Sequence, residues 1–223
     1  MSGAPRHALR THGWLAFTNN RLAVVDAAPT AKPGRERILD AAAAVMRDKG
    51  ITSATTKAIA AAAGYSEPML YKHFADKQEL FLAVLEERLP SVRPAIAAGG
   101  ATGDLVESIA AILEQLMSFY VEVFPLTASL YGDPKLLARH REGVRRAGDW
   151  GPTGPILLVR EYLDIQRDEG RVREDADTEA AAQLLVGAAF QSGFLATFSG
   201  RTAVPDAAAR SRALADAILP SLT

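Results

Sequence analysis

The stretch from Thr55 to Phe74, TTKAIAAAAGYSEPMLYKHF, contains two short helical segments separated by a glycine. Thr55 or Thr56 can cap the first segment, because a threonine hydroxyl accepts a hydrogen bond from the backbone of the first turn. Gly64 ends that segment, since glycine adopts the left-handed conformation that closes many helices. Ser66 can cap the second segment almost at once. This spacing predicts a helix-turn-helix, in which the second helix enters the major groove of DNA.

The second segment carries a cluster of hydrogen-bond donors. Tyr71, Lys72, His73 and Lys77 surround Phe74, which we expect to be buried. Side chains of these types supply many of the contacts that proteins make to DNA phosphates. Tyr71 could instead be a packing aromatic and Lys72 a solvated charge. We favour phosphate contacts, because they explain why all four donors share one short segment.

Helical periodicity extends on both sides of this motif. Apolar residues recur at helical spacing in residues 35–50 and again in residues 76–89, where Asp76 can cap the helix. The remainder of the chain shows helical patterns in four further stretches: residues 105–120, 156–166, 175–199 and 207–219. No run alternates with the period of two that a strand needs, so we predict an all-α fold.

Over residues 35–89 the sequence resembles the TetR family of bacterial transcriptional regulators, and TTKAIAAAAGYSEPMLYKHFADKQEL carries the resemblance. The resemblance implies an all-α homodimer with a three-helix DNA-binding domain and a helical C-terminal domain for dimerisation and a small-molecule effector. We therefore expect a flexible arm in residues 1–34, the helix-turn-helix domain in 35–78 and the effector-binding and dimerisation domain in 79–223. The expected function is that of a cytoplasmic repressor, released from a palindromic operator by the effector.

The resemblance also implies which residues meet DNA. They lie at the start of the second helix, along the recognition helix and at the start of the fourth helix: Thr56, Lys57, Ser66, Glu67, Pro68, Met69, Tyr71, Lys72, His73 and Lys77. Glu67 departs from the family pattern, because a basic or amide residue is usual at its position. Its carboxylate could accept from the amino group of a cytosine, or could be a favourable charge at the helix N-terminus.

Composition and charge are compatible with this interpretation. The chain has 223 residues, 48% of them hydrophobic, and a net charge of −1. Up to residue 92 it has 12 Lys and Arg against 9 Asp and Glu, and beyond that 13 against 17, so only the front part suits an anionic partner. The arm at 1–34 is basic and is either a solvated tail or a minor-groove contact. With no cysteine and four scattered histidines, the sequence offers no disulfide and no metal-ligand spacing.

Other functional classes find little support. Residues 180–200 lack charged side chains, but their glutamines, serines and glycines favour a helix buried against protein over a membrane span. Residues 148–155, GDWGPTGP, lack the Lys-Ser/Thr ending of a phosphate-binding loop and follow no strand. We therefore expect no enzyme activity, no catalytic residue and no cofactor. The remaining alternative is a helical small-molecule-binding or adaptor protein without DNA affinity, which leaves the donor cluster unexplained.

The predicted effector domain is rich in aromatic residues that can line an apolar pocket. These are Phe119, Tyr120, Phe124, Tyr131, Trp150, Tyr162, Phe190 and Phe194. Residues 145–155, RRAGDWGPTGP, are expected to be flexible and to open as an entrance. Residues 175–199 and 207–219 are expected to form a four-helix bundle with a second copy, because so long an uncharged face is unfavourable in water. The helix at 76–89 joins both domains and is the expected lever between them.

Overall fold

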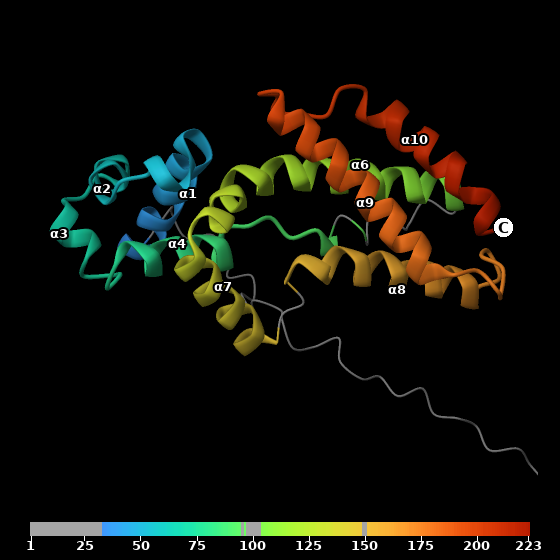
Figure 1. The fold of residues 1–223 in the computed structure, drawn as a ribbon, viewed down its shortest axis with the longest axis horizontal. Helices are drawn as coiled ribbons and strands as arrows, with labels where there is room; N and C mark the ends of the chain where they lie inside the picture. The colour runs from blue at the N-terminus through green and yellow to red at the C-terminus, as the bar shows by residue number, and fades with distance from the viewer. Residues whose placement is uncertain (1–32, 95, 97–103, 149–150) are drawn as a thin grey trace, which may run out of the picture. The chain divides into compact units, whose positions relative to one another are not determined.

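The computed structural model describes residues 33–94, 96, 104–148 and 151–223, so the expectations for residues 1–32 lie outside its scope. Over the described residues the fold is helical and contains no strand, which confirms the all-α prediction. The α-helices are α1 (Gly34–Ser53), α2 (Thr56–Ala63), α3 (Glu67–Leu70), α4 (Lys77–Glu87), α6 (Leu105–Thr127), α7 (Pro134–Ala147), α8 (Gly154–Asp168), α9 (Thr178–Phe198) and α10 (Ala207–Ile218) (Figure 1). Short 3-10 helices are η1 (Ala128–Gly132), η2 (Gly151–Thr153) and η3 (Leu219–Ser221).

The ends of the first helices follow from the residues that stand there. Gly50 interrupts α1 with φ 72°, at the point where the apolar stripe predicts its end. Thr55 accepts a 3.1 Å hydrogen bond from a backbone N–H of the first turn of α2, and Gly64 ends α2 with φ 75°. Asp76 accepts from the N–H of Glu79 at 2.6 Å and so caps α4. These predicted caps and stops are confirmed.

The recognition segment is less helical than predicted. α3 contains only Glu67–Leu70, and Ser66 occupies its N-cap position without a side-chain hydrogen bond. Beyond α3 the backbone continues as a turn, in which the N–H groups of residues 72–74 donate to the carbonyls of Met69 and Leu70. The helix expected over residues 66–73 is therefore one helical turn followed by a tighter turn.

Two hydrophobic cores lie within the compact unit formed by residues 33–223. The N-terminal core joins α1 to α4 with the end of α6, η1 and the start of α7, and includes Ile38, Leu39, Met46, Ile59, Leu70, Phe74, Leu80, Val84, Leu126, Leu130 and Leu136. The C-terminal core joins the rest of α6 with α8, α9 and α10. The boundary expected between residues 78 and 79 falls inside α4, and α4 packs in the N-terminal core with the helix-turn-helix. The boundary itself stays a prediction.

α7 is a helix that the sequence analysis does not predict. Leu136, near the start of α7, is its buried residue. The sequence of α7 therefore lacks an apolar stripe long enough to predict a helix. Asp133 caps α7 by accepting from two backbone N–H groups at 3.0 and 3.1 Å, and Gly148 ends it with φ 63°. The flexibility predicted for residues 145–155 stays a prediction, although the part of this stretch that the structure describes is largely helical. Residues 145–147 form the last turn of α7, and η2 and α8 follow from residue 151.

α9 packs along α6 and buries one of its faces (Figure 1). Leu185, Val186 and Ala189 lie on that face, so the prediction of a helix buried against protein is confirmed for one side. The other side exposes large apolar residues: Leu184, Phe190, Phe194, Leu195 and Phe198. By length and composition alone, α9 and the stretch from α6 through η1 could each cross a membrane. In each apolar window 44% of the residues are buried inside the fold.

Three ion pairs join the end of α4 to the start of α1. Arg35 of α1 donates hydrogen bonds of 2.8 and 2.5 Å to the Glu87 carboxylate of α4. Arg88 reaches back to α1, where it pairs with Glu36 and, at 2.9 Å, with Asp40. The hydrogen bond from Arg35 lowers the pKa of the Glu87 carboxyl group. These pairs hold the end of α4 against the start of α1.

Candidate nucleic-acid interface

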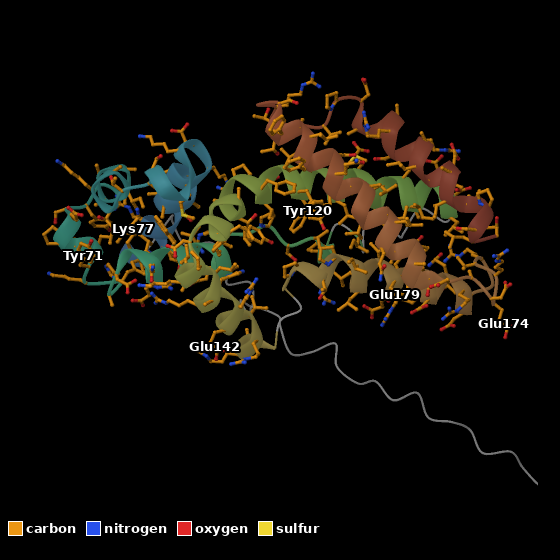
Figure 2. The ribbon with its side chains drawn as sticks, viewed as in Figure 1. Tyr71, Lys77, Tyr120, Glu142, Glu174 and Glu179 are labelled. Carbon is orange, nitrogen blue, oxygen red and sulfur yellow. The ribbon has the colours of Figure 1, made fainter. Side chains whose placement is uncertain are left out.

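Most of the predicted DNA-contacting side chains reach the surface of α2, α3 and the following turn. The exposed ones are Lys57, Ser66, Pro68, Tyr71, Lys72 and His73. Glu67, Met69 and Lys77 are partly buried, and Thr56 is buried with 8% of its surface exposed. Tyr71 lies next to α3, and Lys77 lies at the start of α4 (Figure 2). The structure thus brings this set together on one small region.

The turn between α2 and α3 is held by a residue of α1. The Arg37 guanidinium lies 4.8 Å from the centre of the Tyr65 ring and donates to its hydroxyl at 3.3 Å. The same guanidinium donates to the carbonyl oxygen of Ala63 at 2.8 Å. Sequence reasoning missed Arg37 and Tyr65, because no local spacing relates residues so far apart. Their contacts fix the angle at which the recognition segment leaves α2.

Thr56, Glu67 and Tyr71 form a hydrogen-bonded chain between α2 and α3. The Tyr71 hydroxyl donates to Thr56 Oγ1 at 3.4 Å, and the Thr56 hydroxyl donates to Glu67 Oε1. Threonine has one hydroxyl hydrogen, so in this arrangement Thr56 has none to offer to a phosphate. Tyr71 is 46% exposed, and its longer bond is the weaker of the two. The DNA contacts predicted for both residues remain predictions.

Lys77 begins α4 beside the capping carboxylate of Asp76. Its ammonium nitrogen lies 5.0 Å from the centre of the Phe81 ring, within cation–π range. A backbone N–H of the first turn and, second, the guanidinium of Arg139 lower the pKa of the Asp76 carboxyl group. Arg139 belongs to α7 and also donates to Gln78 at 2.9 Å. No local spacing in the sequence predicts this contact, which links α7 to the start of α4, the end that is predicted to meet a phosphate.

The aromatic residues predicted to bind an effector gather only in part. Rings of α6 and α9 form a continuous series with centroid separations of 5.0 to 6.1 Å: Phe119, Tyr120, Phe124, Phe190, Phe194 and Phe198. Burial raises the pKa of the Tyr120 hydroxyl to about 12, and it raises the pKa of Tyr162 in α8. Tyr131 is 75% exposed on η1, and Trp150 lies outside the described residues. Sequence reasoning missed Phe198, which extends the series.

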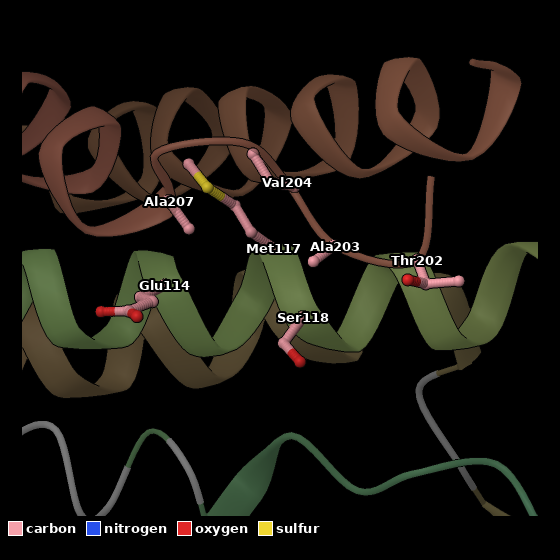
Figure 3. A pocket seen from close by; sticks show the side chains of 7 residues that line it. All are labelled: Glu114, Met117, Ser118, Thr202, Ala203, Val204 and Ala207. Atoms are coloured by element: carbon pink, nitrogen blue, oxygen red, sulfur yellow. The ribbon is translucent and has the colours of Figure 1, made fainter. Parts of the chain in front are cut away.

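A small pocket lies elsewhere, between α6 and the segment that leads into α10 (Figure 3). Its volume is about 190 Å³ and its lining is Glu114, Met117, Ser118, Thr202, Ala203, Val204 and Ala207. None of the predicted effector-binding aromatics lines it. With Phe190 49% and Phe194 46% exposed, part of the aromatic series faces the surface of the single chain, and its predicted role in lining an apolar pocket stays a prediction.

Short crossing helices, a glycine turn and an exposed set of hydrogen-bond donors are the features of a helix-turn-helix DNA-binding protein. The sequence profile of bacterial regulatory proteins of the tetR family matches residues 38–84, the segment that forms most of this unit. Residues 38–84 thus form a DNA-binding domain of the tetR-family type, and the chain is a DNA-binding transcriptional regulator.

Relatives and solved structures agree with this assignment. The chain is 28% identical over 152 residues to the transcriptional repressor AcnR of Corynebacterium efficiens, covering 65% of this chain and 72% of that one. It is 43% identical over 58 residues to the transcriptional activator FasR of Mycolicibacterium smegmatis, but this match covers only 26% of either chain. The fold is similar to that of FadR from Bacillus subtilis, solved with stearoyl-CoA, with a TM-score of 0.62, 16% identity and coverage of 84% and 99%.

Proposed function

We propose that the protein is a cytoplasmic repressor that binds a palindromic operator as a homodimer and leaves it when a small apolar molecule binds its C-terminal helices. It needs no catalytic residue for this function. The observation that carries the proposal is the exposed donor set of α2, α3 and the following turn. We assign the DNA contacts to the residues predicted from the sequence, with Thr56 as a support of Glu67.

The operator is expected to contain two half-sites about 34–36 Å apart, or a small multiple of that distance, because a two-fold dimer presents its recognition segments to separate major grooves. Binding is expected to weaken steeply with salt, since the lysines release counterions from DNA. Footprinting of upstream DNA, followed by titration at several salt concentrations, measures both. A protected site without two-fold symmetry contradicts the dimeric arrangement.

Lys77→Ala is expected to weaken binding to all DNA sequences alike and to reduce the salt slope by about 1, because a phosphate contact carries no base information. Titrations of the operator and of an unrelated duplex at several salt concentrations measure both effects. Arg173→Ala, an exposed charge in the loop between α8 and α9, is the matched control and should leave both unchanged. Since Lys77 also lies over Phe81, thermal unfolding checks that the variant is folded. Operator binding equal to the wild type removes Lys77 from the interface.

The effector is expected to be a mainly apolar molecule that lowers operator affinity by about 1–3 kcal/mol. Two observations support this proposal: the aromatic series of α6 and α9, and the position of α6, which contributes to both hydrophobic cores. FadR of Bacillus subtilis, which shares the fold, was solved with stearoyl-CoA, so fatty acyl compounds belong in the first screen. Thermal shift finds stabilising compounds, and operator titration follows. If every stabilising compound leaves operator affinity unchanged, the protein is a constitutive repressor.

A further inference from the structure

The two carboxylate oxygens of Glu67 stand in different situations. Oε1 accepts the hydroxyl of Thr56, a residue that is itself more than nine-tenths buried. Within the described residues no donor reaches Oε2. Because Glu67 is the first residue of α3, its side chain lies at the start of the segment that enters the major groove. The structure thus presents one anchored oxygen and one oxygen available to DNA.

The anchoring restricts how this carboxylate can meet DNA. Tyr71 donates to Thr56 and Thr56 donates to Glu67, so each hydroxyl in the chain is oriented toward the carboxylate. A glutamate on the surface otherwise samples many rotamers, and fixing them in advance reduces the entropy lost on binding. A pre-positioned acceptor of this kind discriminates between base edges better than a mobile one.

The chemistry of the base edges selects one partner for Oε2. In the major groove guanine presents only acceptors, and thymine presents an acceptor and a methyl group. Adenine presents an acceptor beside its amino group, whereas cytosine presents the amino group alone. A carboxylate has acceptors and no N–H donor, so cytosine is the base that it matches without facing another acceptor.

We propose that Glu67 is a specificity-determining residue that selects a cytosine in each half-site, and that Thr56 and Tyr71 are the positioning residues that aim its carboxylate. The inference rests on the proposed function, because it requires α3 to lie in the major groove of an operator. It assigns a function to the residue that departs from the family pattern.

The test is selection of DNA from a pool of duplexes with two randomised half-sites, using the full chain. The wild type should enrich a palindrome with one invariant cytosine in each half. Glu67→Gln should change the preferred base at that position from cytosine to adenine, by about tenfold in relative affinity, because an amide pairs with the adenine edge. Thr56→Val keeps the shape of the side chain and Glu67 itself but removes the anchor. It should reduce the preference for cytosine several-fold at that position alone, which a general loss of stability cannot do.

Lys72→Ala is the control, and it should lower affinity while it leaves the enriched sequence unchanged. If the wild type enriches a palindrome and Glu67→Gln enriches the same one with the same cytosine preference, the assignment of Glu67 is overturned while the proposed function stands. If Thr56→Val retains the full cytosine preference, the positioning role is overturned. Failure of the wild type to enrich any sequence overturns the proposed function and this inference together.

Discussion

Gly193→Ala is expected to lower the free energy of unfolding by about 1–3 kcal/mol, the usual cost of overpacking a core, although alanine is the better helix former. Gly193 lies where α9 crosses α6. A Cβ atom at this position would stand 2.6 Å from Tyr120 Cβ and 3.3 Å from backbone atoms of Tyr120 and Val121. Backbone cannot move aside as a flexible side chain does, so the two helices must separate and lose packing along the C-terminal core.

Gly187 of the same helix is the matched control. Within one chain nothing lies within 4 Å of a Cβ atom built on it. In a chain that also carries Leu184→Glu and Leu195→Glu, so that the exposed side of α9 pairs with no second copy, Gly187→Ala is expected to raise the free energy of unfolding by about 0.5–1 kcal/mol through helix propensity. Urea denaturation of both variants, at one protein concentration because oligomers unfold with a concentration dependence, gives the difference. Equal stabilities for the two variants would contradict the close approach of α9 to Tyr120 and Val121 of α6 at Gly193.

The features that sequence reasoning predicted correctly are those that neighbouring residues determine. Thr55, Gly64 and Asp76 each act within a few residues of their own position, so a cap or a left-handed stop can be recognised without knowledge of the fold. α7 was missed because its stability depends on Leu136 reaching a core built by α1 and α4. Arg37 and Arg139 were missed for the same reason, since their partners are distant in sequence.

The candidate site shows the same limit. Sequence spacing placed the donors of the recognition segment on one unit, but it did not show that Thr56 is buried and bonded to Glu67. Likewise, aromatic residues at helical spacing predict an apolar helix face, but they do not show whether that face packs in the core of the same chain or remains exposed. In the structure Tyr120 is buried against α9, whereas Phe194 and Phe198 of that helix remain exposed. Only the arrangement of α6 and α9 separates these environments.

The exposed side of α9 is the proposed dimer interface, and changing it should have the second large effect. Its large apolar side chains remain 46–79% exposed in the single chain: Leu184, Phe190, Phe194, Leu195 and Phe198. Apolar patches of this kind on a regulator mark interaction sites, and a two-fold pairing of α9 with its copy covers the same patch on both chains. α10, which packs on α6 beside α9, is proposed to complete the four-helix bundle.

Leu184→Glu combined with Leu195→Glu is expected to convert the proposed dimer to a monomer, because each carboxylate buried in such an interface would lack a partner. These two leucines are exposed and take no part in the ring series, so the variant leaves the core of each chain intact.

The monomer loses the avidity of two linked half-sites, and affinity for the full operator should fall by about 10²–10⁴-fold. Affinity for an isolated half-site should stay unchanged, because the recognition segment is untouched. Tyr131→Glu is the control, as Tyr131 is even more exposed, at 75%, but lies on η1. Sedimentation gives the oligomeric state and titration with both duplexes gives the affinities. A variant that still sediments as a dimer, or that loses half-site binding along with operator binding, places the interface elsewhere than on α9.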